Sequence, residues 1–398
     1  MTAKSRTLVT TALLAVLSAC AGAPTATTAP ADPISRSATP SASASTAPSE
    51  TAQRPTATQC AARIVDKMTP AERVGQVVMV GVTSGTASEL AVLRKLHIGS
   101  VILMGNHSDG TSGVRRLTKK LQISGLPTPL LISVDQEGGL VQRLKGSGFD
   151  TIPSAKVQSK WSDAKLTSRA TRWGRQLASA GVHWTLAPVT DTVPTSVGTK
   201  NAPIGALGRG YGSNPDVVGK KVSAFVKGMD AAGIATSTKH FPGIGRVIGN
   251  TDFTSGVKDT TTRPDDPYLA PFAAAVKAGA TSVMVSTVTY TKIDPDHVAA
   301  FSPKVIGLIR GRLGFDGVVI SDDLGAAKSM ASVPAKQRGA DFIKAGGDVA
   351  MTVTPALADE FVAGIRSAAK NSAVAAQVRE AAIRVVTMKI DQGLVPCR

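Results

Sequence analysis

The sequence has few cysteines, few aromatic residues and no long block of basic charge. Three of its 398 residues are cysteine and none form a Cys-x-x-Cys pair, which argues against a structural zinc site or a thioredoxin-like motif. Aromatic residues make up 4%, and no run of five Lys or Arg occurs although the formal net charge is +17. We therefore expect no nucleic-acid partner, because the chain offers few platforms for base stacking and no concentrated basic run.

The chain also lacks the usual signatures of cofactor and metal sites. Residues 243–249 read Gly-x-Gly-x-x-x-Gly, but this spacing differs by one residue from the dinucleotide-binding fingerprint. No Gly-x-Ser-x-Gly nucleophile elbow occurs, and the histidines show no metal-ligand spacing. We expect neither a metal nor an organic cofactor.

The N-terminus has the character of a secretory signal. Lys4 and Arg6 precede a short apolar stretch over residues 11–17, which is too short for a permanent membrane span. Residues 17–20 read Leu-Ser-Ala-Cys and resemble the bacterial lipobox. We expect residues 1–20 to be a signal peptide, with lipidation of Cys20 anchoring an exported protein to the outer face of the cell membrane. The alternative is an ordinary signal-peptidase site beside a cysteine that has no role.

Residues 21–59 form a low-complexity stretch. Ala, Thr, Ser and Pro occupy 31 of these 39 positions, so few bulky apolar side chains are available to offset the entropy cost of ordering. We expect a disordered tether here and a folded domain over residues 60–398. That domain has 41 basic and 26 acidic residues, a net charge of +15.

Two cysteines stand at the ends of the expected domain. Cys60 opens it and Cys397 is its penultimate residue, and in an exported protein we expect them to form a disulfide. A loop this long would stabilise the fold by about 4–5 kcal/mol in the chain-entropy model. Two unpaired thiols are the alternative.

The domain alternates eight short apolar runs with amphipathic stretches. The runs are continuously apolar, which is typical of parallel strands buried on both faces. Proline begins several of the helical stretches, in agreement with its preference for the first turn. Eight strand–helix units favour a single (β/α)8 TIM barrel of the α/β class, and a doubly wound open sheet is the alternative. The predicted strands are Gln76–Val82, Ile98–Met104, Pro129–Val134, Val182–Ala187, Ile234–Thr238, Ser282–Thr287, Gly317–Ser321 and Asp348–Thr352.

Charged residues follow three of these strands. Residues 135–139, Asp-Gln-Glu-Gly-Gly, follow the third, Lys239 and His240 follow the fifth, and Asp322 and Asp323 follow the seventh. Barrel enzymes carry their chemistry at the carboxyl ends of the strands. Because charged groups are costly to bury without partners, we expect these side chains to share one polar pocket.

The motifs VDQEGGLVQR, TKHFPGIG and VVISDDL occur in this order and resemble glycoside hydrolase family 3. The resemblance is to its single-domain β-N-acetylhexosaminidase branch, which includes actinobacterial lipoproteins, and it covers essentially all of residues 60–398. It implies a barrel fold and a retaining mechanism through a covalent glycosyl-enzyme. The family's β-glucosidases usually carry a second domain that contributes the acid/base, and we expect no such domain here.

The resemblance also assigns roles to individual residues. Asp322 matches the nucleophile, and Asp323 is the local alternative for that role. Gly208 stands where the family has an aspartate next to its arginine. The residues expected to bind the sugar are Asp135, Arg143, Arg209, Lys239 and His240.

The sequence departs from the family at the general acid/base. The family loop ends in an Asp-x-His motif, but this chain has Asn250 and Asp252 at the two positions. A leaving-group oxygen needs a proton donor, so the departure bears directly on activity. We expect Asp252 to serve as the acid/base; the alternatives are Asp259 or another loop carboxylate after a loop shift, or a protein that binds glycan but hydrolyses it poorly.

The expected function is therefore an exported exo-β-N-acetylglucosaminidase, EC 3.2.1.52-like, that acts on GlcNAc-containing cell-wall glycan or muropeptides. We expect a monomer whose membrane contact is its lipid anchor. The alternative is a non-catalytic cell-wall glycan-binding lipoprotein, which the substitution at Asn250 keeps open.

Overall fold

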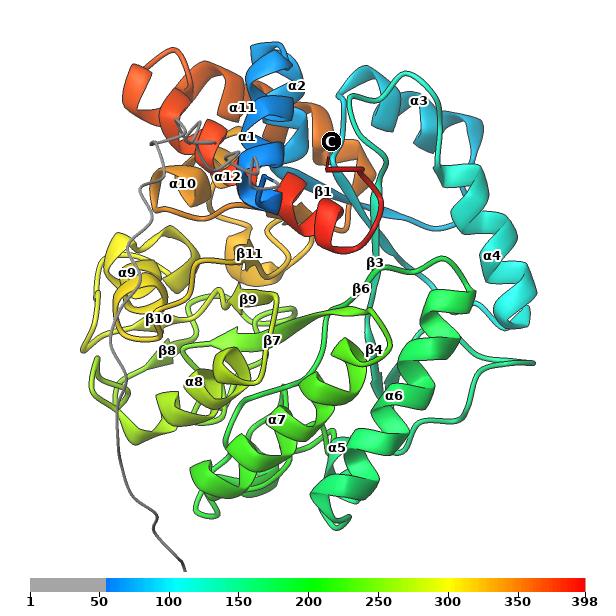
Figure 1. Ribbon diagram of the computed structural model, residues 1–398. Coiled ribbons are helices and arrows are strands. Elements are labelled where there is room, and N and C mark those ends of the chain that lie inside the picture. The colour runs from blue at the N-terminus through cyan, green and yellow to red at the C-terminus, as the bar shows by residue number, and fades with distance from the viewer. Residues whose placement is uncertain (1–54, 398) are drawn as a thin grey trace, which may run out of the picture. The chain divides into compact units, whose positions relative to one another are not determined.

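The computed structural model describes residues 55–397, which fold as a (β/α)8 barrel with strands inside and helices outside (Figure 1). All neighbouring strands of the eight-stranded sheet run parallel. A parallel bridge between Ile320 and Val349 joins the last two strands and closes the barrel. The predicted fold class and all eight predicted strands are confirmed. The barrel strands are β1 (Val78–Val82), β2 (Ser100–Leu103), β3 (Leu131–Val134), β6 (Trp184–Thr185), β7 (Ala235–Phe241), β9 (Ser282–Val285), β11 (Val318–Ser321) and β12 (Ala350–Thr352).

Eight helices follow the strands and cover the outside of the barrel, and three more lie at the two ends of the domain. The outer helices are α3 (Ala87–Lys95), α4 (Gly110–Leu121), α6 (Asp163–Ser179), α7 (Pro215–Asp230), α8 (Ala270–Lys277), α9 (Pro303–Gly311), α10 (Ala335–Lys344) and α11 (Ala358–Ala368). The terminal helices are α1 (Ala57–Lys67), α2 (Pro70–Gln76) and α12 (Ser372–Asp391).

The loops contain further short elements. They are α5 (Ala155–Gln158), the strands β4 (Gln136–Gly138), β5 (Val141–Gln142), β8 (Lys258–Asp259) and β10 (Thr289–Tyr290), and the 3-10 turns η1 (Gly198–Lys200), η2 (Pro267–Leu269), η3 (Ala299–Phe301), η4 (Lys328–Met330) and η5 (Pro355–Leu357). Among residues 55–397, no helix is both long and apolar enough to cross a bilayer.

The first helix, α1, begins at Ala57 and has a capping box at its start. Thr56 caps α1, since its hydroxyl accepts the Gln59 amide while the Gln59 side chain accepts the Thr56 amide. Such a capping box stabilises a helix start. The expected domain boundary at residue 60 therefore lies inside α1. Cys20 and the expected signal peptide lie outside the described residues, as does most of the expected tether.

Apolar side chains pack against both faces of the barrel strands. One cluster occupies the inside of the barrel and a larger one lies between the strands and the outer helices. This double-sided burial is why the strands read as continuous apolar runs. The inner cluster includes Met79, Ile102, Leu131, Trp184, Met284, Ile320 and Met351.

A disulfide joins the two ends of the domain. Cys60 in α1 and Cys397 after α12 are bonded, with their Cα atoms 5.4 Å apart across a sequence separation of 337 residues. The same two helices are linked by an ion pair in which Arg379 Nε lies 2.7 Å from Asp66 Oδ1. Figure 1 shows α1 and α12 side by side at this end of the domain.

Lys389 of α12 is a buried amine without a carboxylate partner among residues 55–397. Its Nζ donates to Gln76 Oε1 and to Thr128 Oγ1, both at 2.8 Å, and the side chain is fully buried. Burial lowers the pKa of Lys389 from 10.5 to about 7. Between these two values the unfolded chain holds a proton that the folded chain lacks, so Lys389 makes stability rise with pH.

We predict that Lys389→Met removes this pH dependence. The wild-type free energy of unfolding should rise between pH 7 and pH 10 relative to the variant, by about 1.4 kcal/mol for each pH unit. Urea denaturation of both proteins over this pH range measures the difference between their free energies of unfolding. The contributions of other titrating groups cancel in this difference because both proteins contain them. Parallel pH curves would show that Lys389 keeps its proton in the folded state.

Candidate active site

Charged residues from several strands meet at the carboxyl ends of the barrel. Asp135 follows β3, Lys239 and His240 lie near the end of β7, and Asp322 follows β11. Ion pairs and electrostatic effects on the pKa of Asp322 link these four residues directly. The structure therefore brings the three sequence motifs into one site, as the strand order requires.

The centre of the site is a buried network of ion pairs. Lys239 Nζ lies 2.7 Å from Asp135 Oδ1 and 2.7 Å from Glu137 Oε1. Arg209 binds Glu137 with two hydrogen bonds, from Nε to Oε2 at 2.9 Å and from Nη2 to Oε1 at 2.8 Å. Two cations thus share one buried carboxylate, and paired charges of this kind tolerate burial where single ones do not.

The charges of this network fix its protonation states. Burial opposes the ionisation of Glu137, but Arg209 and Lys239 outweigh it and hold the pKa of that carboxyl well below its ordinary range. Burial likewise opposes the charge on Lys239, and the carboxylates of Asp135 and Glu137 raise its pKa above 10.5. The network therefore stays charged at neutral pH. Sequence reasoning did not assign a role to Glu137, although it lies within the Asp-Gln-Glu-Gly-Gly motif.

His240 is held by a second buried carboxylate that sequence reasoning missed. Asp191 is fully buried, and its Oδ2 lies 2.7 Å from His240 Nδ1. It also accepts the backbone amides of His240 at 3.3 Å and of Ile244 at 2.7 Å. These contacts fix the imidazole and the start of the following loop. The available signal was the position of Asp191 shortly after the fourth predicted strand.

The structure distinguishes between the two neighbouring aspartates after β11. Asp323 uses both carboxylate oxygens to accept the backbone amides of Gly325 and Val353 at 2.9 Å and of Ala326 at 2.7 Å. Asp322 accepts one backbone amide, from Asp323 at 2.9 Å. Asp322 therefore keeps free acceptor capacity, while Asp323 holds the loop together.

The pKa of Asp322 reflects the whole site. Burial raises the pKa of this carboxyl, the charge of His240 lowers it, and the charge of Asp252 raises it again. Asp252 and Asp322 are thus close enough to interact, which is a requirement for a pair of carboxylates that acts on one glycosidic bond.

The two acid/base candidates differ in availability. Asp252 is exposed, and within residues 55–397 it forms hydrogen bonds through its backbone alone, with its amide donating to Asn250 Oδ1 at 3.0 Å. Asp259 is buried, and its carboxylate accepts the amides and hydroxyls of Thr261 and Thr262 at 2.7–3.0 Å. The side chain of Asp259 therefore serves a structural turn, and Asp252 remains the available donor.

Arg143 carries an unused hydrogen-bond donor. Its backbone amide donates to Gln136 Oε1 at 3.1 Å, which places the residue opposite the Asp135 turn. Its Nε is buried and has no hydrogen-bond partner among the described residues. The guanidinium of Arg143 also forms no ion pair with any of these residues. An unpaired buried donor is costly, so a ligand oxygen at this position would be stabilising.

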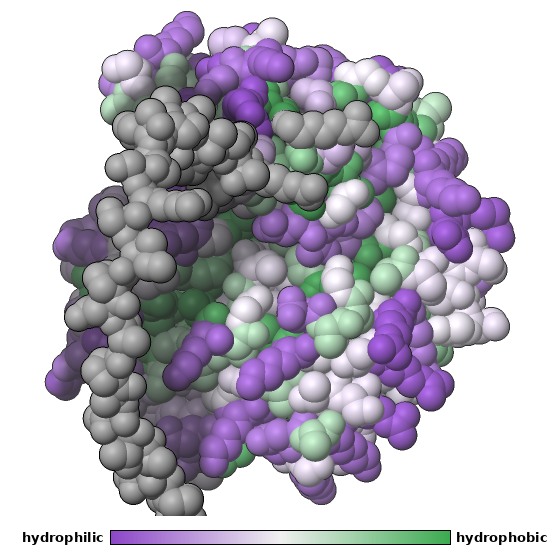
Figure 2. Space-filling view, in the orientation of Figure 1, coloured by the Kyte–Doolittle hydropathy of each residue, from purple (hydrophilic) through white to green (hydrophobic). Residues whose placement is uncertain are grey.

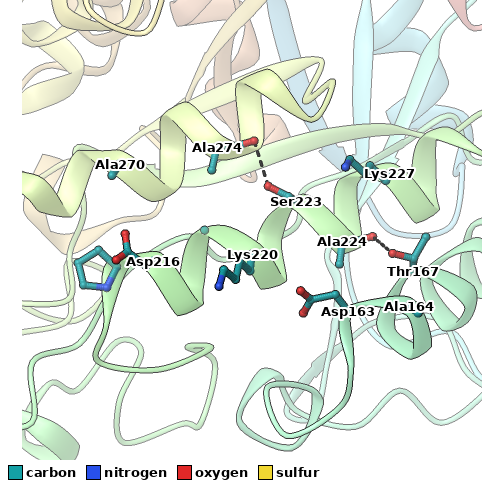
Figure 3. A pocket seen from close by; sticks show the side chains of 12 residues that line it. Asp163, Ala164, Thr167, Asp216, Lys220, Ser223, Ala224, Lys227, Ala270 and Ala274 are labelled. Carbon is teal, nitrogen blue, oxygen red and sulfur yellow. Dashed lines mark hydrogen bonds between the residues drawn. The ribbon is translucent and has the colours of Figure 1, made fainter. Parts of the chain in front are cut away.

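A groove of about 580 Å³ on the outer wall of the barrel is separate from this site. It lies between α6, α7 and α8, and Figure 3 shows that the hydroxyls of Ser223 and Thr167 in it already donate to backbone carbonyl oxygens. None of the predicted site residues lines it. Residues 55–397 also contain no cluster of three or more His, Cys, Asp or Glu arranged to hold a metal ion.

Comparisons with known proteins agree with the geometry. Residues 69–388 match the family described as the glycosyl hydrolase family 3 N terminal domain. A β-hexosaminidase of Stenotrophomonas maltophilia (strain R551-3) is 33% identical over 312 residues, which cover 75% of this chain and 89% of that protein. The crystal structure of a β-N-acetylhexosaminidase from Beutenbergia cavernae is 40% identical with a TM-score of 0.78, covering 82% of this chain and 99% of that one.

A structure of LpqI from M. tuberculosis is also similar, with 28% identity and a TM-score of 0.74 over 84% of this chain and 97% of that one. These matches span nearly the whole barrel. The chain belongs to glycoside hydrolase family 3, and the resemblance seen in its motifs is confirmed. It is a glycoside hydrolase whose site residues lie where the strands of the barrel end.

We predict that Glu137→Gln is strongly destabilising. The variant leaves two buried cations with less compensating charge, which should lower the free energy of unfolding by about 3–5 kcal/mol. The matched control is Asp359→Asn, which removes the exposed Lys95–Asp359 pair and should cost within about 1 kcal/mol. Urea denaturation of the two variants measures both values, and equal losses would contradict a central role for the buried network.

Proposed function

We propose that the protein is an exported, retaining exo-β-N-acetylglucosaminidase that removes terminal β-linked GlcNAc from peptidoglycan-derived fragments. The chain is a glycoside hydrolase of the β-N-acetylhexosaminidase type, in agreement with its family and its relatives. The observation that carries the proposed mechanism is the contrast after β11, where Asp323 is fully engaged and Asp322 is not.

The terminal sugar would bind among the charged side chains at the centre of the site. The free donors of Arg143 and the cations of Lys239 and Arg209 can bind sugar hydroxyls, and Asp135 can accept from them. Polar contacts of this kind reject sugars that lack the matching hydroxyl more strongly than apolar contacts do. The ion pairs hold these groups in place before the substrate arrives, which limits the cost of reorganisation.

The reaction would proceed in two steps. Asp322 attacks the anomeric carbon, the bond from that carbon to the leaving oxygen breaks, and Asp252 donates its proton to this oxygen. Asp252, now ionised, takes a proton from water, whose oxygen attacks the same carbon and releases Asp322. The sugar leaves with its anomeric configuration retained, and both carboxyl groups return to their starting states.

We predict that Asp322→Asn and Asp323→Asn fail in different ways. Asp322→Asn should reduce hydrolysis of an aryl β-N-acetylglucosaminide by at least about 10³-fold with little change in stability, because it removes the nucleophile. Asp323→Asn should lower the free energy of unfolding, because an amide nitrogen cannot accept a backbone N–H. Activity assays paired with urea denaturation separate the two outcomes. A stable, fully active Asp322→Asn protein would rule out the covalent mechanism.

The role of Asp252 has its own signature. We predict that Asp252→Ala slows hydrolysis of glycosides with poor leaving groups far more than that of activated aryl glycosides, because only the former need protonation of the leaving oxygen. With an activated substrate the glycosyl-enzyme should accumulate, and its mass can be measured on the Asp322 peptide. An equal loss on both substrates would contradict the assignment of Asp252.

Export and lipid anchoring are proposed from the sequence of the N-terminus. Cys20 in its lipobox-like context would carry the lipid, and residues 21–54 would span the distance to the folded domain. The net charge of +15 over residues 60–398 would favour an anionic envelope. Hydrophilic side chains are spread over the face drawn in Figure 2, with smaller apolar areas between them. Release of the protein from cell membranes by Cys20→Ala would support the anchor.

An aryl β-N-acetylglucosaminide assay on the wild-type protein tests the proposal as a whole. Release of the aryl group by the folded wild type supports the enzyme, and loss of release in Asp322→Asn links that activity to this site. The absence of any release from correctly folded wild type would instead favour a glycan-binding lipoprotein, which the replacement of the family aspartate by Asn250 keeps open.

A further inference from the structure

Basic side chains are concentrated on helices α4 and α6. Together these helices contain eight Lys and Arg residues and one acidic residue, Asp163, whose carboxylate already pairs with Lys221 at 2.6 Å. The two helices are neighbours on the outside of the barrel (Figure 1), and the Thr118 hydroxyl of α4 donates to the carbonyl of Ala180, which ends α6, at 2.8 Å. They therefore supply +7 of the net charge of +15 on residues 60–398.

Four of these cations lie on the exposed surface of α4. None of them forms an ion pair with any of residues 55–397. Like charges stand one helical turn apart along this surface, a spacing that destabilises a helix, so a bound anion would relieve their repulsion. The four residues are Arg115, Arg116, Lys119 and Lys120.

Two depressions in the surface show where side chains of these helices lie. The first has a volume of about 540 Å³ and is lined by Arg115 and Lys119 of α4 and by Ala178 of α6. The second, of about 560 Å³, is lined by one face of α6 that includes Arg175. No acidic residue among 55–397 lines either depression. We call Arg115, Lys119 and Arg175 the basic patch.

The first depression also has an apolar wall. Ile123, Leu126 and Pro127 of the loop between α4 and β3 line it, and so does Leu394, which follows α12. All four are half-buried, while residues 124 and 125 at the tip of the loop are exposed. Cations beside apolar side chains match the boundary between lipid headgroups and acyl chains. A soluble polyanion would leave the apolar wall uncovered, so the lining favours a lipid surface.

The first depression lies at the end of the barrel opposite the active site. Its lining includes Thr128 and His183, which stand just before β3 and β6, at the amino ends of these strands. Asp135 and Asp322 of the active site instead follow the carboxyl ends of β3 and β11. A surface that covers the depression would therefore leave the active site open.

The N-terminal segment of the chain joins the domain at the same end. Leu394 in the wall of the depression is close in sequence to Cys397, whose disulfide with Cys60 holds α1 beside α12. The segment that leads to Cys20 connects to the start of α1. A lipid on Cys20 and the basic patch would thus act on the same end of the barrel.

We propose that the basic patch is a docking surface for a membrane that contains anionic phospholipids. Headgroup phosphates bind the ammonium and guanidinium groups of the patch, and the apolar wall meets the upper part of the acyl chains. Docking turns the carboxyl ends of the strands, and with them the active site, away from the bilayer. The inference rests on the proposed export and membrane location, and it is independent of the catalytic mechanism.

Vesicle binding by the chain without its lipid tests this proposal. Residues 20–398 with Cys20→Ala contain the whole described domain and cannot be acylated. This protein should sediment with vesicles made of equal parts of phosphatidylglycerol and phosphatidylcholine, and it should stay in solution with vesicles of phosphatidylcholine alone. Binding should weaken as salt screens the charges.

Two triple variants of this protein locate the contact. Neutralising the basic patch with Arg115→Gln, Lys119→Gln and Arg175→Gln should weaken binding about 100-fold, because each basic side chain near an anionic surface contributes a factor of about five. Both triple variants should keep the wild-type stability to urea and the wild-type aryl glycosidase activity. The matched control removes three exposed cations near α9 and α10, on the far side of the barrel, and should lower binding much less: Lys304→Gln, Arg312→Gln and Lys336→Gln.

A fluorescent label tests the orientation. In the Cys20→Ala protein the other two cysteines are joined in the disulfide, so a new cysteine is the single site for a polarity-sensitive dye. On Ser124→Cys, at the exposed loop tip, the emission should shift to the blue when anionic vesicles are added. On Ser255→Cys, exposed on the Asp252 loop, it should not change.

Several results would overturn the docking surface. Equal binding to both kinds of vesicle would remove the role of charge, and equal losses in the two triple variants would remove the role of this patch. Binding of soluble inorganic polyphosphate through the patch, without a shift of the label at residue 124 on vesicles, would identify a soluble polyanion as the partner instead. A shift at residue 255 would reverse the orientation. Failure to hydrolyse an aryl β-N-acetylglucosaminide would count against the proposed enzyme alone, because vesicle binding and the label do not depend on catalysis.

Discussion

The site depends on one buried carboxylate that neutralises two cations. Glu137 joins Arg209 and Lys239, and Lys239 in turn binds Asp135, so segments after β3 and β6 are tied to the end of β7. Two positive side chains at the mouth of a barrel would repel each other without this carboxylate. With it, both cations are held in fixed positions before any ligand binds.

The carboxylates of the site divide into those that hold the structure and those that remain free. Glu137, Asp191, Asp259 and Asp323 are buried and use their oxygens on cations, backbone amides or hydroxyls. Asp252 and Asp322 are left with unused acceptor capacity. The division matters because a carboxylate that already accepts several hydrogen bonds would have to break them before it could attack or move a proton.

The eight strands could be predicted because each is buried on both faces and therefore reads as a short apolar run, as Val78–Val82 shows. The short β6 was found in the same way despite having only two residues in the ladder. The position of Asp191 after the fourth predicted strand places it near the site, but its role could not be predicted because its partner His240 is 49 residues away.

The sequence by itself determined the parallel barrel, the family and the three motifs that build the site. Strands that are buried on both faces appear as short apolar runs, and each motif consists of residues that are contiguous in the chain, so both can be recognised locally. Only the tertiary structure decided which carboxylates are free. Asp322 and Asp323 are adjacent and have the same side chain. The two acid/base candidates, Asp252 and Asp259, also have the same side chain. What separates them is the set of amides and hydroxyls that the fold brings to each carboxylate, such as the Val353 amide, which reaches Asp323 from 30 residues away.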